Sequence, residues 1–269
     1  MIDFTQDHRN QFPYEDWISY FEKNDTKRLR LDFSEEKPLT EQEKKLIFPS
    51  IRAFQKGEGS DGKFLLQTVE HYVKAGGPAE YQRAMELFVK EENWHSAYLK
   101  AYLEHYGIKS AKKSALDAIF RKLRHLGGIK CEVTVLVTAE MIALTYYDAL
   151  ANCTDSKVLK RICQQMLDDE VPHIQFQSYT LSRFRPNRMD ILLRALLMNF
   201  TLLFVWGAFH QVYRTGGYGF IRFLKENNDT LRQSVFLYRK QKSLAFAKKE
   251  ELSREGGAAG VLPGKRTPS

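Results

Sequence analysis

Two glutamate–histidine pairs in the sequence have the spacing needed to hold a metal ion. Glu92 precedes His95, and Glu170 precedes His173, each by three residues. Residues at positions i and i+3 of a helix lie on one face, so the carboxylate and the imidazole of each pair can bind the same ion. Oxygen and imidazole donors without a thiolate suit iron or manganese better than a soft metal.

Two further glutamates occupy matching positions in other helical segments. In four segments the apolar residues recur at spacings of three and four, which predicts helices with one buried face. Each of these apolar stripes carries one glutamate near its middle: Glu58, Glu92, Glu140 and Glu170. An unpaired carboxylate in a dry bundle costs on the order of several kcal/mol. Because Lys and Arg are absent from the stripes of the last three segments, a metal cluster is the natural source of compensating charge.

Four other polar residues are placed to support such a cluster. Glu91 and Asp169 each stand four residues before a histidine, where they would accept the second ring N–H of a metal-bound imidazole; the alternative is that both are plain solvated acids. Tyr98 and Tyr147 lie one to two turns beyond the candidate ligands. Either tyrosine is a candidate electron donor near the metals, and the alternative is that both are ordinary core residues.

The order of these residues resembles the ferritin-like, rubrerythrin-like di-iron carboxylate superfamily, whose pattern is Glu, Glu-x-x-His, Glu, Glu-x-x-His. The match covers roughly Phe48 to Leu181, with intervals of 34, 48 and 30 residues between successive glutamates. The resemblance implies an all-α fold, a ferritin-like four-helix bundle made of two antiparallel helix hairpins. We expect the long crossover between the hairpins to hold a short helix at Ala115–Leu126.

The resemblance also implies two metal ions and a role for each ligand. Glu92 and Glu170 would bridge the two ions. The remaining ligands would each bind one ion: Glu58 and Glu140 as terminal carboxylates, and His95 and His173 as the imidazole ligands. Iron is the expected metal, with manganese as the alternative.

Two features of the sequence complicate this ligand set. Glu58 lies among Gly57, Gly59 and Gly62, and glycine inside a helix costs about 1 kcal/mol relative to alanine. Either a neighbouring backbone approaches closely here, or the segment is a loop and Glu70 supplies the ligand; the phase of the stripe favours Glu58. In the last motif a proline, residue 172, should kink the helix while leaving both ligands on one face.

For function, the resemblance implies a non-haem di-iron or Mn/Fe carboxylate oxidoreductase that activates O2 or peroxide. The alternative is an iron-binding or storage protein without turnover of an organic substrate, although about 40 residues before the bundle and about 85 after it would obstruct cage packing. A structural bundle whose acids pair with unseen cations is a third hypothesis. Because the sequence has no Cys-rich rubredoxin-like module, the electron donor would be a separate protein or small molecule.

Composition narrows the remaining function classes. The 269 residues are 43% hydrophobic and 28% charged, which is typical of a globular protein. Cys131, Cys153 and Cys163 are too few for a disulfide framework or a zinc ribbon, so we expect a reducing, cytoplasmic setting. The net charge is +8, of which +5 lies from Arg239 onward (eight Lys/Arg, three Asp/Glu), so the nearly neutral body argues against a nucleic-acid partner.

The chain is expected to divide into four segments. Residues 1–39 form an N-terminal arm with a short helix around Asp16–Lys23, and residues 40–185 form the metal-binding bundle. Residues 186–246 add helices that cover the bundle or form a homodimer interface, and residues 247–269 are a disordered basic tail. Ile191–Phe209 nearly has the length to span a bilayer, but Arg194 and Asn199 interrupt it. We therefore expect a helix buried against protein, and no membrane anchor.

Overall fold

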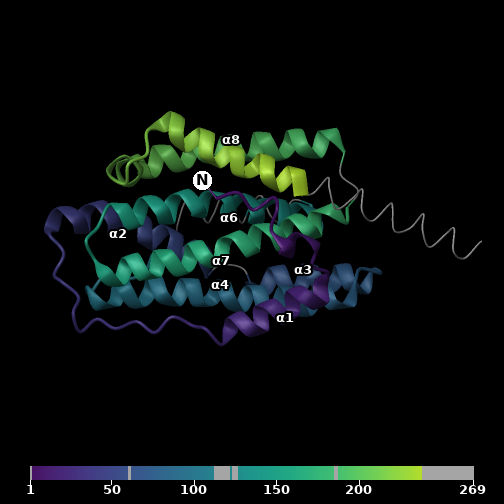
Figure 1. Cartoon of the computed structure of the whole chain (residues 1–269), viewed down its shortest axis with the longest axis horizontal. Coiled ribbons are helices and arrows are strands. Elements are labelled where there is room, and N and C mark those ends of the chain that lie inside the picture. The colour runs from purple at the N-terminus through teal and green to yellow at the C-terminus, as the bar shows by residue number, and fades with distance from the viewer. Residues whose placement is uncertain (1, 60–61, 112–121, 123–126, 185–186, 238–269) are drawn as a thin grey trace, which may run out of the picture.

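The computed structural model describes residues 2–59, 62–111, 122, 127–184 and 187–237. Over these ranges the regular structure is helical and includes no strand, so the prediction of an all-α protein is confirmed. The long helices lie side by side as a bundle (Figure 1). The helix expected at Ala115–Leu126, almost in its entirety, and the tail expected over residues 247–269 lie outside the described residues.

The long helices include α2 (Glu41–Glu58), α4 (Ala79–His105), α6 (Gly128–Asn152) and α7 (Lys157–Ser182). α6 packs along α7, and α4 contacts both α2 and α7. Capping interactions define where α2 and α7 begin. Thr40 and Glu43 form a reciprocal capping box at the start of α2, and the hydroxyl of Ser156 accepts a hydrogen bond from the N–H of Leu159 in α7.

The first apolar stripe is two helices, so its prediction as one continuous helix was wrong. α2 ends at Glu58, and α3 (Gly62–Lys74) begins four residues later. A Cβ atom on Gly59 would lie 2.6 Å from Oγ of Ser96, and one on Gly62 would lie 2.7 Å from a methyl carbon of Val89. The glycines therefore allow close contact with α4, the first of the two explanations considered above, and they leave Glu58 in the last turn of α2.

The N-terminal arm packs over the outside of the bundle. Its 3-10 helix η1 (His8–Gln11) contacts α7, and α1 (Tyr14–Asp25), which contains the short helix expected at Asp16–Lys23, contacts α4. Trp17 and Phe21 of α1 are buried in the core. This packing holds the last turn of α1, with Asn24, beside α4 and α7.

At the other side of the bundle, α8 (Arg188–Thr215) and the helix over residues 220–237 form an antiparallel hairpin on α6 (Figure 1). By length and composition, α6 and α8 are both apolar enough to cross a membrane, but their burial differs: 78% of the α6 window is buried and 28% of the α8 window.

The expectation that Ile191–Phe209 is buried against protein holds for one face of α8 only. Arg194 is buried, and its Nη2 donates a hydrogen bond to Oγ of Ser234 at 2.7 Å. Asn199 is exposed and exchanges hydrogen bonds of 3.2 Å with Asn228 in the neighbouring helix. Hydropathy alone did not separate these two environments, because both faces of the helix are apolar.

Candidate metal centre

The structure brings the six candidate ligands together between α2, α4, α6 and α7. Three groups of side chains place their donor atoms within 4.8 Å of one another: Glu92, His95 and His173; Glu58, His95 and Glu170; and Glu140, Glu170 and His173. Both histidines and Glu170 belong to two of these groups. The donors therefore form one continuous cluster that could hold more than one ion.

Both histidines turn the Nδ1 side of the ring toward the carboxylates. Nδ1 of His173 lies 3.0 Å from Oε1 of Glu92 and 3.7 Å from Oε2 of Glu170. Nδ1 of His95 lies 3.5 Å from the same oxygen of Glu92 and 3.9 Å from Oε1 of Glu170. Glu140 approaches Nδ1 of His173 to 3.6 Å. Glu92 and Glu170 thus lie next to both imidazoles, which is the position that a bridging carboxylate requires.

Several of these buried atoms make no hydrogen bond of suitable geometry among the described residues, although Nδ1 of His173 and Oε1 of Glu92 are only 3.0 Å apart. They are Nδ1 of His95 and of His173, both carboxylate oxygens of Glu170, and Oε1 of Glu92. A buried polar group without a partner costs about 1–3 kcal/mol, more when it is charged, and native structures contain few of them. Their convergence on one point fits a cation bound by oxygen and imidazole donors.

Burial and mutual repulsion set the protonation of the cluster. Burial raises the pKa of Glu58 and of Glu170 well above the ordinary value, and the neighbouring carboxylates raise both further. Burial alone would lower the pKa of His173, but the surrounding carboxylates, Glu140 first, outweigh it and raise this pKa well above the usual value. Burial also opposes the charge on His95, whose pKa is raised by its hydrogen bond to Asp169. These raised pKa values favour bound protons on Glu58, Glu170 and His173, whereas the neighbouring Glu170 and His173 outweigh burial and lower the pKa of Glu140.

Glu91 and Asp169 bind the outer nitrogens of the two histidines, and each does so across the bundle. Oδ2 of Asp169, on α7, lies 3.1 Å from Nε2 of His95 on α4. Oε2 of Glu91, on α4, lies 3.1 Å from Nε2 of His173 on α7. The interpretation of these residues as solvated acids is therefore wrong. Contact of Nε2 with a carboxylate favours the tautomer that carries its proton on Nε2, in which the Nδ1 atom of each ring can bind a metal ion.

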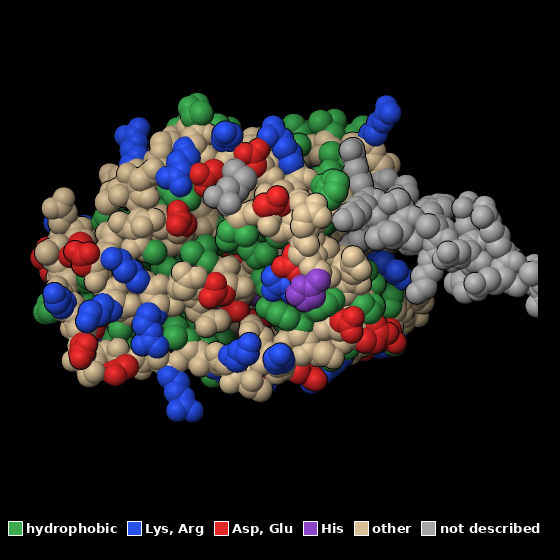
Figure 2. Space-filling view, in the orientation of Figure 1, with side chains coloured by type: hydrophobic (Ala, Val, Ile, Leu, Met, Phe, Trp, Pro, Cys, Tyr) green, Lys and Arg blue, Asp and Glu red, His purple; other side chains and the backbone are tan. Residues whose placement is uncertain are grey.

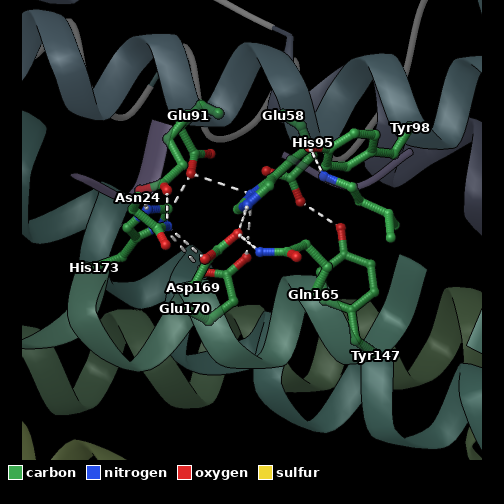
Figure 3. Close-up of polar contacts among 12 residues, drawn as sticks. Asn24, Glu58, Glu91, His95, Tyr98, Tyr147, Gln165, Asp169, Glu170 and His173 are labelled. Carbon is green, nitrogen blue, oxygen red and sulfur yellow. Dashed lines mark hydrogen bonds and ion pairs between the residues drawn. The ribbon is translucent and has the colours of Figure 1, made fainter. Parts of the chain in front are cut away.

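Two residues that the sequence analysis did not select complete this outer layer (Figure 3). Nδ2 of Asn24 donates hydrogen bonds to Oδ1 of Asp169, at 2.9 Å, and to Oε1 of Glu91. Nε2 of Gln165 donates to Oδ2 of Asp169 at 2.8 Å. Gln165 stands four residues before Asp169, a helical spacing that could have indicated the pair. Asn24 is 67 residues from Glu91, and nothing in the local sequence indicates this contact.

The two candidate tyrosines have different surroundings. Tyr147 is fully buried, and its hydroxyl donates a hydrogen bond to Oε1 of Glu58. The hydroxyl of Tyr98 instead accepts a hydrogen bond of 3.1 Å from the N–H of Leu29 in the arm. Burial raises the pKa of both phenols. Tyr147 therefore contacts the cluster directly as a neutral hydroxyl, whereas Tyr98 contributes to the attachment of the arm.

The structure also distinguishes between Glu58 and Glu70, the two alternative ligands from the first predicted helical segment. Glu70 lies on α3 in an ion pair of 2.5 Å with Nζ of Lys74, away from the cluster, whereas Glu58 lies within it. In the last motif α7 continues as a helix through Pro172, so Glu170 and His173 remain on one face.

The cluster leaves only a small cavity on the side of the arm, and a separate surface groove lies beside α3. Next to His95 and Asp169 a cavity of about 20 Å³ remains, enough for about one water molecule. On the other side, a surface groove of about 870 Å³ is lined by residues that include Gly59 and Asn93, the sequence neighbours of Glu58 and Glu92. None of the six candidate ligands lines this groove.

No family model, curated protein or solved structure matches this chain. The functional argument therefore depends on the geometry of the cluster.

Proposed function

We propose that this protein is a ferritin-like, non-haem dinuclear carboxylate oxidoreductase that activates O2 or peroxide, with two iron ions or a manganese–iron pair. In this proposal α2 continued by α3, α4, α6 and α7 are the four helices of the bundle. The observation that carries it is the convergence of four glutamates and two histidines in a buried cluster, in which Nδ1 of both histidines and both oxygens of Glu170 make no hydrogen bond among the described residues. This donor set is the one used by di-iron and di-manganese carboxylate bundles.

The distances support a division of roles among the ligands. Glu92 and Glu170 lie within 4 Å of both Nδ1 atoms, so each would bridge the two ions. Glu58 reaches the cluster beside His95, and Glu140 reaches it beside His173. Each would complete the coordination of one ion as a terminal ligand.

Two bound iron ions would supply redox chemistry and open coordination positions for the oxygen species. Residues around the cluster hold the candidate ligands in position for this chemistry. Asp169 and Glu91 keep the proton on Nε2 of the two imidazoles, which fixes their orientation. Tyr147 holds the carboxylate of Glu58 through its hydroxyl. The ring of Phe88 packs edge-on against His173, with centroids 4.8 Å apart, and helps exclude water.

The main alternative is iron binding or storage without an organic substrate. One observation favours the enzyme. The arm packs on α4 and α8 packs on α6, so the outer faces of these two helices are not free to contact identical copies in a cage. The electron donor would be a separate molecule.

Metal loading tests the proposal. The chain should be freed of metal, loaded with ferrous iron without oxygen, and measured by elemental analysis and by absorption spectroscopy after exposure to air. We expect about two iron ions per chain and a new absorption band on oxidation. Continued consumption of O2 or peroxide with an added reductant supports the enzyme, whereas uptake of many more irons supports storage. Fewer than one tightly bound ion per chain overturns the dinuclear site.

A further inference from the structure

The outer face of α8 is an exposed apolar stripe. Six of its large hydrophobic side chains are each more than half exposed: Met189, Leu192, Leu193, Leu196, Phe200 and Leu203. They recur at spacings of mostly three or four, so they lie on one side of the helix. Figure 2 shows hydrophobic side chains at parts of the upper edge of the molecule, where Figure 1 places α8, with Lys and Arg side chains nearby. A continuous exposed patch of this kind marks a binding surface.

The exposed charges around this stripe are all positive. Among the described residues from 187 to 237, the exposed charged side chains are Arg188, Arg214, Arg222, Lys225 and Arg232. The acidic side chains in the same range are only partly exposed, and each is in an ion pair: Asp190 with Lys130, Glu226 with Arg222, and Asp229 with Arg232. The surface presented by the hairpin is therefore apolar and cationic.

The sequence that follows the hairpin is also rich in basic residues. The helix over residues 220–237 runs back along α8, and its Ser234 bonds Arg194 near the start of α8. The sequence that continues from there carries eight Lys/Arg and three Asp/Glu from Arg239 to the end. Clusters of basic residues beside an apolar helix are attracted to anionic lipid headgroups.

We propose that the outer face of α8 docks on an anionic membrane surface, with the helix lying in the plane of the interface. The stripe would enter the boundary between headgroups and acyl chains, and the basic residues would contact the headgroups. A spanning orientation does not fit, because α8 is packed on α6 and its partner helix carries Arg222, Lys225 and Asp229. A second copy of the chain fits less well, because two such faces would oppose like charges. This proposal goes beyond the oxidoreductase activity and does not depend on it.

Vesicle co-sedimentation of the full chain tests the proposal without any variant. One set of vesicles contains phosphatidylcholine alone, and the other contains phosphatidylcholine with phosphatidylglycerol. We expect preferential binding to the anionic vesicles, and weaker binding as salt shortens the Debye length from about 10 Å at 0.1 M to about 3 Å at 1 M. No binding to anionic vesicles at low salt overturns the proposal.

Two sets of variants then separate the apolar and the cationic contributions. Leu196→Glu with Phe200→Glu should lower vesicle binding more than about tenfold, because it puts two carboxylates into the stripe. Phe64→Glu, at an apolar side chain of α3 that is 38% exposed, is the matched control and should bind normally. Arg214→Gln with Lys225→Gln should reduce the preference for anionic lipid. Circular dichroism checks that each variant is folded.

The oligomeric state tests whether a second copy of the chain, instead of a membrane, covers the outer face of α8. Light scattering after gel filtration should be compared for the unmodified chain and the Leu196→Glu, Phe200→Glu variant. A dimer that the variant dissociates, together with no vesicle binding by either protein, would assign the stripe to a second copy and overturn the membrane proposal. Equal vesicle binding by this variant and the Phe64→Glu control would also overturn it.

Discussion

Asp169 on α7 binds Nε2 of His95 on α4, at 3.1 Å, although His173 stands only four residues away on its own helix. Glu91 makes the reciprocal bond from α4 to His173 on α7. Each histidine is therefore oriented by a carboxylate from the opposite helix. The two helices cannot slide past each other without breaking both bonds, so the packing of the bundle and the orientation of the inner Nδ1 atoms are set together.

Asn24 joins these two carboxylates, and its removal should weaken metal binding. In Asn24→Ala, Glu91 and Asp169 lose the amide that donates to both, and their repulsion is no longer offset. We expect metal affinity to fall about 10- to 100-fold, as for other residues that support metal ligands indirectly. Competition between the protein and a chelator for Mn²⁺ or Fe²⁺ measures this. Asn199→Ala, at an exposed amide on α8, is the matched control, and equal affinity for the two variants would contradict the role of Asn24.

Removing both proposed bridges should abolish the dinuclear site. The double substitution Glu92→Ala, Glu170→Ala deletes the two carboxylates that lie next to both histidines. We expect loss of both ions, measured by elemental analysis of the folded protein. The variant Glu92→Gln, Glu170→Gln keeps the side-chain volume and should also lose the metals. Retention of two ions by either variant would show that the metals bind elsewhere.

Glu58 and Glu70 provide an internal comparison on neighbouring helices. Glu58 is within reach of His95 and Glu170, whereas Glu70 is paired with Lys74 at the surface. Glu58→Gln should lower metal affinity or the number of ions bound, and Glu70→Gln should leave both unchanged. A metal-loaded crystal structure gives the direct measurement, in which an oxygen of Glu58 should lie about 2.0–2.5 Å from an ion. A Glu58 carboxylate that does not contact a metal in that structure would refute the assignment.

The convergence of the six candidate ligands was predictable from helical periodicity. A residue's position in the 3.6-residue repeat determines which face of the helix it lies on, so a glutamate in an apolar stripe must point into the bundle. This argument placed Glu58, Glu140 and Glu170 correctly at the interior. It succeeded for Glu58 even though the stripe is broken after it, because Glu58 is the last residue of α2 and keeps the phase of the preceding turns.

Contacts that depend on the packing between helices were not predictable in the same way. Periodicity assigns Asp169 to a face of α7 but does not show which histidine it meets. The contact of Asn24 with Glu91 and Asp169 depends on where the arm docks, which no local pattern specifies. Likewise, the apolar composition of α8 does not show that one face would be covered by protein and the other left exposed.

Metal loading should release protons, and metal affinity should fall as the pH falls. The pKa of Glu58 and of Glu170 is raised by burial and by neighbouring carboxylates, and the pKa of His173 is raised by the carboxylates around it despite burial. A raised pKa means that the group keeps its proton to a higher pH, so protons compete with the metal over a wider range. An indicator dye in weakly buffered solution should show acidification when Mn²⁺ is added. Affinity that does not change with pH would contradict this protonation of the metal-free site.

The junction between α2 and α3 predicts opposite effects for two glycines that are two residues apart. A Cβ atom on Gly57 would meet nothing within 4 Å, so Gly57→Ala should stabilise the helix by about 0.5–1 kcal/mol. A Cβ atom on Gly59 would lie 2.6 Å from Oγ of Ser96, which is held by two hydrogen bonds of 3.0 Å to Gln55. Gly59→Ala should therefore lower the free energy of unfolding by about 1–3 kcal/mol. Urea unfolding of the metal-free proteins measures both changes, and equal stability of the two variants would show that close contact with α4 does not require glycine at residue 59.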